Sequence, residues 1–158
     1  MATGKILTIE LPDEAATQAL AVSLAKLVNN GEQLALIGDL GTGKTVFARA
    51  FVRALCGSDT EVPSPTFTLL QTYDAEDGRE LFHFDLYRLE NSREALELNI
   101  DDAFADGISL IEWPERLGSL LPRNHLELTL SYGSSESHRQ AMITAGDNWY
   151  KRLQGISL

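Results

Sequence analysis

The apolar residues of the chain fall into short strand-like runs and helix-spaced positions that alternate along its first half. Residues 5–11 alternate weakly between polar and apolar side chains, which predicts a strand. Leucines then recur with helical spacing, and Gly31 marks the end of that predicted helix. An apolar run at residues 33–37 predicts a buried strand, and helical spacing returns after it as far as Leu55.

The middle of the chain predicts a β-hairpin. Residues 67–73 and 79–86 have strand-like patterns, and an Asp-Gly pair between them supplies the residues of a tight turn. Alternation along the second strand places Asp85 on the opposite face from Phe84. His83 shares the face of Asp85, so we expect it either to orient that carboxylate or to be a hydrogen-bonded structural histidine.

The second half predicts short helices followed by further strands. Ser92 and Asp101 have the side chains of helix N-caps. An apolar strand is predicted at residues 108–112, and two more strands at residues 125–132 and 139–145. Strict alternation over residues 126–132 places the last residue of that strand, a tyrosine, on its apolar face.

The loop between the strand at residues 33–37 and the next helix has the phosphate-binding pattern G-x-x-x-x-G-K-[ST]. Its glycines can adopt positive φ values, so that successive N–H groups point at an anion. Lys44 supplies a cation for the β- and γ-phosphates, and Thr45 supplies a hydroxyl suited to Mg²⁺. A plain glycine-rich turn is the alternative, but the strand before and the helix after favour a nucleotide site. The predicted nucleotide-binding residues are Gly38, Asp39, Leu40, Gly41, Thr42, Gly43, Lys44 and Thr45.

The strand at residues 108–112 ends in Glu112, which gives it the form of a Walker B element. Ligands of open α/β folds sit at the carboxyl ends of the strands. We therefore expect the Glu112 carboxylate beside a Mg²⁺ ion held by Thr45. The alternative is a strand at the edge of the core with a solvated glutamate.

Three further residues are candidates for the same site, each with a structural alternative. Thr66 ends a polar loop, where switch segments present a threonine to the metal and the γ-phosphate, but it also fits a strand start. Asp85 and Arg88 suit water positioning or phosphate charge, and equally suit an ion pair. Trp113 follows Glu112 directly, which places it near the nucleotide, on an interaction face or in the core.

Composition narrows the classes of function. A chain of 158 residues has the size of one domain, over residues 1–158. The net charge of −10 argues against binding nucleic acid through the overall field, so we expect any RNA to be held by a partner. Cys56 is the single cysteine, which excludes an internal disulfide and a CxxC metal site. The sequence has neither a membrane-length apolar run nor a signal peptide, which predicts a cytoplasmic protein.

Four sequence blocks in a fixed order carry a family resemblance. GDLGTGKT at residues 38–45, SPTF at 64–67, HFDLYR at 83–88 and IEWPE at 111–115 are similar to the blocks of the TsaE family of small bacterial ATPases. The four blocks occur in the expected order between residues 38 and 115. The first is shared by many families, whereas the other three together are specific to this one.

The resemblance implies an α/β P-loop NTPase fold, a single domain with a mixed β-sheet flanked by helices. It also implies binding of ATP, ADP and Mg²⁺, weak ATP hydrolysis, and a role in making threonylcarbamoyladenosine in tRNA, beside the anticodon. The implied partners are the TsaB and TsaD proteins, which would bring tRNA to this chain only indirectly, and the oligomeric state of the free protein stays open. By motif match Lys44 binds phosphate, Thr45 and Glu112 hold Mg²⁺, and Thr66, Asp85 and Trp113 belong to the functional site.

Two other classes of P-loop protein are alternatives. A small-molecule kinase needs an acceptor pocket and usually an arginine-bearing lid. Arg49 and Arg53 fall within the helix after the P-loop rather than in such a lid. A GTPase needs an N-K-x-D motif to read guanine, and the sequence contains none. The kinase therefore remains the alternative prediction.

Overall fold

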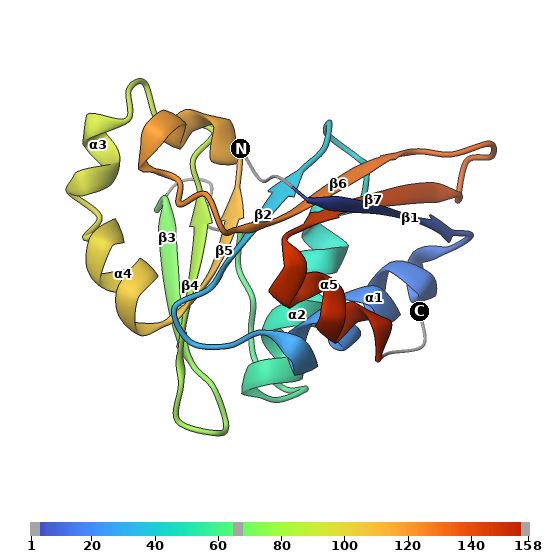
Figure 1. Cartoon of the computed structure of the whole chain (residues 1–158), viewed down its shortest axis with the longest axis horizontal. Coiled ribbons are helices and arrows are strands. Elements are labelled where there is room, and N and C mark those ends of the chain that lie inside the picture. Colours follow the sequence, from blue (N-terminus) through green and yellow to red (C-terminus); the bar gives the residue numbers. More distant parts are fainter. Residues whose placement is uncertain (1–3, 65–67, 156–158) are drawn as a thin grey trace.

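The structure, a computed structural model, describes residues 4–64 and 68–155, which form one seven-stranded sheet with helices on both faces (Figure 1). The strands are β1 (Lys5–Leu11), β2 (Gln33–Ile37), β3 (Leu70–Asp74), β4 (Glu80–Asp85), β5 (Ile108–Glu112), β6 (Leu126–Tyr132) and β7 (Arg139–Ala145). Their order in the sheet is β1-β7-β6-β2-β5-β4-β3. The four central strands β6, β2, β5 and β4 are parallel, and β1, β7 and β3 pair antiparallel to their neighbours.

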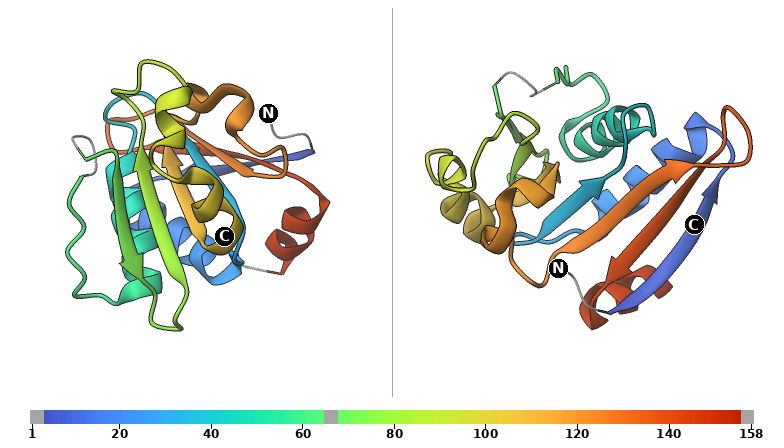
Figure 2. Two further views of the ribbon diagram at one scale, coloured as in Figure 1. Left: turned by 90° about the vertical axis from the view of Figure 1, so that its left-hand side faces the viewer. Right: turned by 90° about the horizontal axis from the view of Figure 1, so that it is seen from above.

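The helices divide between two hydrophobic clusters on opposite faces of the sheet (Figure 2). They are α1 (Glu14–Leu27), α2 (Lys44–Cys56), α3 (Arg93–Leu96), α4 (Ile100–Asp106), the 3₁₀ helix η1 (Pro114–Leu120) and α5 (Asp147–Gln154). Helices α1, α2 and α5 bury apolar side chains in the larger cluster, together with Leu81 and Leu110 of the sheet. Helices α3, α4 and η1 pack on the other face, against Phe84 and Ile111. The alternation expected for the hairpin strand is therefore confirmed.

Four of the predicted strands have the bounds expected from the hydrophobic pattern, at residues 5–11, 33–37, 108–112 and 139–145, and β6 begins one residue later than expected. The predicted hairpin is also confirmed, because β3 and β4 pair antiparallel. Its first strand is shorter than expected and runs from Leu70 to Asp74. No helix in the described ranges is long and apolar enough to cross a membrane.

One of the two predicted helix caps is confirmed in position and the other is wrong. Ser92 is the N-cap of α3, although its side chain makes no capping hydrogen bond; Asn91 Oδ1 instead accepts a hydrogen bond from the backbone N–H of Arg93 (3.0 Å). Asp101 lies inside α4, whose N-cap is Asn99, a residue at φ 56°. Asparagine tolerates the left-handed conformation better than most residues, which makes it suitable for this junction.

Candidate functional site

The P-loop follows β2, a buried strand that pairs with β5 on one side and β6 on the other. Gly41 (φ 84°) and Gly43 (φ 108°) have left-handed conformations that allow the tight loop before α2. A Cβ atom on Gly38 would lie 2.7 Å from the carbonyl oxygen of Leu130, so only glycine fits beside β6. Within the loop, the Thr42 hydroxyl donates to the carbonyl oxygen of Asp39 (2.7 Å).

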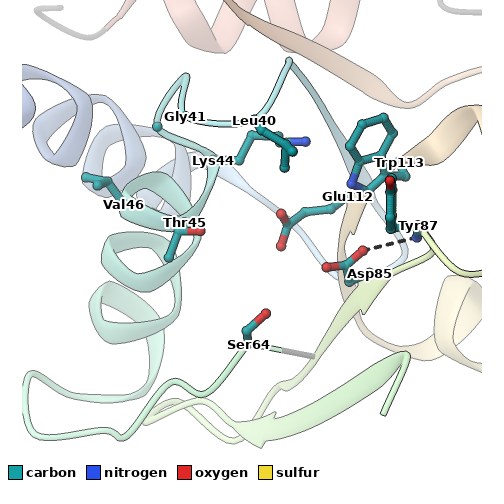
Figure 3. A pocket seen from close by; sticks show the side chains of 11 residues that line it. Leu40, Gly41, Lys44, Thr45, Val46, Ser64, Asp85, Tyr87, Glu112 and Trp113 are labelled. Carbon is teal, nitrogen blue, oxygen red and sulfur yellow. Dashed lines mark hydrogen bonds between the residues drawn. The ribbon is translucent and has the colours of Figure 1, made fainter. Parts of the chain in front are cut away.

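A cavity of about 420 Å³ opens beside this loop at the carboxyl ends of the parallel strands (Figure 3). One wall is the P-loop and the start of α2, and the facing wall comes from the ends of β4 and β5. Such a volume lies within the range of small-molecule and cofactor sites. The lining residues are Leu40, Gly41, Gly43, Lys44, Thr45, Val46, Ser64, Asp85, Tyr87, Glu112 and Trp113.

Two buried carboxylates lie next to each other on the wall opposite the P-loop. Asp85 and Glu112 are aligned partners in the parallel pairing of β4 with β5, so their side chains leave the same face of the sheet. Figure 3 shows both carboxylates and the Thr45 hydroxyl facing the same space. One Asp85 oxygen accepts a hydrogen bond from the backbone N–H of Tyr87 (3.1 Å), which fixes the turn after β4.

His83 holds the second of these carboxylates. Its Nε2 atom lies 2.7 Å from Glu112 Oε2, and both side chains are buried. The expectation of a hydrogen-bonded histidine is confirmed, but the partner is Glu112 rather than Asp85. Nδ1 of His83 is buried without a hydrogen-bond partner among the described residues. The arrangement is that of a second residue orienting a carboxylate from behind the site.

Trp113 links the two walls of the cavity. The ammonium group of Lys44 lies 3.9 Å from the centroid of its ring, and the Tyr87 ring packs against it at 4.9 Å. Trp113 has φ 59° and ψ 51°, a left-handed conformation that is rare for a bulky side chain. Such strain persists only where the surrounding structure imposes it, and it concentrates at functional sites. Trp113 also packs against the smaller hydrophobic cluster, so the same side chain contacts both the core and the cavity.

The donor set of the cavity suits a hard divalent cation. Thr45, Asp85 and Glu112 offer oxygen atoms, which Mg²⁺ prefers over nitrogen or sulfur. Within residues 4–64 and 68–155, no group of three or more His, Cys, Asp and Glu side chains forms a metal cage. Mg²⁺ sites in proteins usually combine one or two carboxylates with water and substrate phosphates, and Asp85 and Glu112 supply two carboxylates here.

The structure brings most of the predicted site residues to this one cavity, but not all of them. Gly38, Asp39 and Thr42 shape the loop without lining the cavity. Thr66 lies outside the described residues. Sequence reasoning missed Tyr87 and the partner of His83. The partner of His83 could be predicted from the sequence only by treating β4 and β5 as parallel neighbours, because aligning their ends places His83 close to Glu112.

Comparison with known proteins gives a consistent result. The family model described as "Threonylcarbamoyl adenosine biosynthesis protein TsaE" matches residues 11–141. The chain is 38% identical to a "tRNA threonylcarbamoyladenosine biosynthesis protein TsaE" of Rickettsia conorii over 85% of this chain and 76% of that protein. A protein of the same name from Bacillus subtilis is 36% identical, over 90% of this chain and 86% of its own length. The crystal structure of Bacillus subtilis YdiB superimposes with a TM-score of 0.78 at 27% identity, covering 98% of this chain and 95% of that one.

Proposed function

Since this chain belongs to the TsaE family, we propose that it is a Mg²⁺-dependent ATPase of low intrinsic activity that supports threonylcarbamoyladenosine modification of tRNA. Its part in this biosynthesis follows from the family. The ATPase activity, the metal ion and the partners are the finer points of the proposal, and the residues of the cavity support them.

The main observation behind the proposal is that the P-loop and two carboxylates, those of Asp85 and Glu112, line one cavity from opposite sides. Lys44 and the loop N–H groups would bind the β- and γ-phosphates, where fixed donors stabilise charge at little cost in reorganisation. Thr45 and Glu112 would hold Mg²⁺, which when bound would stabilise the negative charge of the phosphates. Asp85 faces the same space and would position the attacking water. Thr66 would contact the metal and the γ-phosphate, as the threonine of a switch segment does.

The acidic charge of the chain favours binding to protein partners over direct contact with tRNA. The net charge of −10 disfavours a phosphate backbone, whereas TsaB and TsaD, the partners implied by the family resemblance, would present tRNA themselves. Leu40 and Tyr87 expose apolar surface at the rim of the cavity, so a partner covering this rim would sense the bound nucleotide. We therefore infer that ATP changes a surface read by TsaB and TsaD in the cytoplasm.

Nucleotide binding tests the first part of the proposal. Calorimetry with ATP, ADP and GTP, each with and without Mg²⁺, should show binding of the adenine nucleotides and a weaker or undetectable response to GTP. ATP should be hydrolysed slowly to ADP and inorganic phosphate without any added acceptor. A phosphorylated small molecule appearing in place of free phosphate would instead support the kinase.

Co-purification tests the second part. TsaB and TsaD together should retain this chain more strongly in ATP than in ADP. By linkage, the pair should then raise the affinity of this chain for ATP by the same factor. Equal retention with ATP, with ADP and without nucleotide would exclude the switch while leaving the ATPase intact.

A further inference from the structure

Three consecutive carbonyl groups at the tip of the P-loop each accept a hydrogen bond from a side chain. The Asp39 oxygen accepts from the Thr42 hydroxyl (2.7 Å), within the loop itself. The Leu40 oxygen accepts from the hydroxyl of Tyr132, and the Gly41 oxygen accepts from Nη2 of Arg139 (3.3 Å). The last two donors lie more than 90 residues away in the sequence, on β6 and β7.

The two distant donors form one unit. Tyr132 and Arg139 are directly paired across the antiparallel β6–β7 ladder, and the guanidinium group lies 5.0 Å from the centroid of the Tyr132 ring. Nη1 of Arg139 also donates to the carbonyl oxygens of Glu136 (2.7 Å) and His138 (2.9 Å) in the turn of the hairpin. The fork of the arginine is therefore fixed to the hairpin on one side and reaches the P-loop on the other.

Strand β6 lies close to the P-loop at two points, its start and its tip. Strand β6 already approaches the start of the loop, where a Cβ atom on Gly38 would meet the Leu130 oxygen. A Cβ atom on Gly41 would lie 2.8 Å from the Tyr132 hydroxyl, so the loop passes close to this side chain. Tyr132 is 57% exposed, in contrast to the apolar position expected from the sequence. Burial of its ring thus does not account for its placement against the loop.

The planarity of the peptide bond gives these contacts a consequence. In a trans peptide the C=O group and the following N–H group point in opposite directions. A bond that holds the Leu40 carbonyl outward therefore directs the Gly41 N–H to the opposite side. In the same way, the hydrogen bond from Arg139 to the Gly41 carbonyl fixes the peptide plane that carries the Thr42 N–H. This N–H group donates to the carbonyl oxygen of Asp39 (3.3 Å) and closes the turn of the loop.

We propose that the β6–β7 hairpin acts as a clamp that shapes the P-loop for phosphate, with Tyr132 and Arg139 as positioning residues. The two side chains hold the carbonyl groups of Leu40 and Gly41 from outside, and the loop presents its N–H groups in a fixed geometry before a phosphate arrives. Preorganised donors bind an anion more tightly because they need not be ordered on binding. The inference rests on the proposed nucleotide site but adds two residues that do not touch the nucleotide phosphates.

The test removes one hydroxyl group. In Tyr132→Phe, the affinity for ADP should fall about threefold to tenfold, the effect of one neutral hydrogen bond. Inorganic tripolyphosphate, measured by displacement of a fluorescent ADP analogue, should lose affinity by the same factor because the loss concerns the phosphate site. Arg139→Gln should act in the same direction. Tyr150→Phe and Arg123→Gln are matched controls away from the loop and should leave both affinities unchanged.

A second measurement monitors the loop without any ligand. The backbone order parameter of the Gly41 amide, from ¹⁵N relaxation, should fall in Tyr132→Phe from about 0.85 towards the flexible range below about 0.6. Tyr150→Phe should not change it. If Tyr132→Phe changes neither the ADP affinity nor the order parameter, the clamp is overturned. A loss of ADP affinity with full tripolyphosphate affinity would also overturn it, because that result indicates direct contact of Tyr132 with the base or ribose. A parent protein that binds no ADP would refute the nucleotide site itself, and the order parameter would still test the clamp.

Discussion

The two walls of the cavity are built in different ways. The P-loop wall, residues 38–45, is one continuous stretch whose shape follows from glycines and a helix start. The carboxylate wall, Asp85, Glu112 and Trp113, comes from two strands and depends on the register of β4 against β5. A local motif survives in many contexts, whereas a wall assembled from distant strands exists only in the correctly paired sheet.

The two walls also differ in how their backbone conformations are stabilised. The P-loop wall uses positive φ values at Gly41 and Gly43, where they carry no steric cost. The carboxylate wall has a positive φ at Trp113, a bulky residue for which such a conformation costs about 1–3 kcal/mol. Packing against Tyr87 and Lys44 holds Trp113 in place. We therefore expect the P-loop wall to govern nucleotide affinity and the carboxylate wall to govern hydrolysis and the signal to partners.

The largest effect is expected from Lys44→Ala on the P-loop wall. A hydrogen bond to a charged group contributes about 1.5–3 kcal/mol, so ATP and ADP affinity should fall roughly tenfold to hundredfold or more. Calorimetry measures this fall, and Lys26→Ala on the exposed side of α1 is the matched control. Unchanged affinity in a folded Lys44→Ala protein would contradict the nucleotide site.

The next effect concerns Glu112→Gln on the carboxylate wall. The amide keeps the shape of the side chain but loses the charge that would anchor Mg²⁺. Hydrolysis should fall about tenfold or more, whereas ADP affinity without Mg²⁺ should change less than about threefold. A phosphate-release assay gives the first value and calorimetry the second, with Glu97→Gln as control. Equal hydrolysis in the variant and the parent would make Glu112 a structural residue.

Trp113→Ala tests whether the carboxylate wall carries the signal to partners. Allosteric couplings typically correspond to about fivefold or more in affinity. The preference of TsaB and TsaD for the ATP form over the ADP form should therefore shrink from about fivefold or more towards unity. Nucleotide affinity should fall by a smaller factor, because the P-loop wall remains. Trp113→Phe keeps an aromatic ring over Lys44 and should preserve more of the preference. If TsaB and TsaD keep their full preference for the ATP form of Trp113→Ala, the signal to the partners does not depend on Trp113.

A smaller effect than that of Glu112→Gln is expected from His83, which touches the site only through Glu112. His83→Leu removes the hydrogen bond and should raise the Mg²⁺ concentration for half-maximal hydrolysis about threefold to tenfold. His83→Gln retains a donor and should restore part of the loss. If both variants respond alike, the hydrogen bond to Glu112 has no role in positioning the carboxylate.

Much of the fold was predictable because the signals for it are local. The strand at residues 108–112 is mostly apolar, and β6 alternates clearly, so their predicted bounds match the structure to within one residue. The cap at Asp101 was mispredicted because several polar residues near a helix start satisfy the same rule, and Asn99 is the N-cap of α4 instead. Ser92 was predicted at the correct N-cap position, but Asn91 makes the side-chain hydrogen bond there. Terminal residues of helices are the least certain feature of any such prediction.

The sequence by itself determined the P-loop, because its chemistry lies within eight consecutive residues, 38–45, whose spacing is tied to the loop geometry. It also indicated that Glu112 ends a strand and that Asp85 lies near the end of another. Only the tertiary structure decided that β4 and β5 are neighbours in aligned register, which places the two carboxylates side by side and His83 behind Glu112. The contacts of Tyr132 and Arg139 with the P-loop were likewise decided only by the tertiary structure. Pairing between strands depends on the energy of the whole sheet, and no local pattern in the sequence records it.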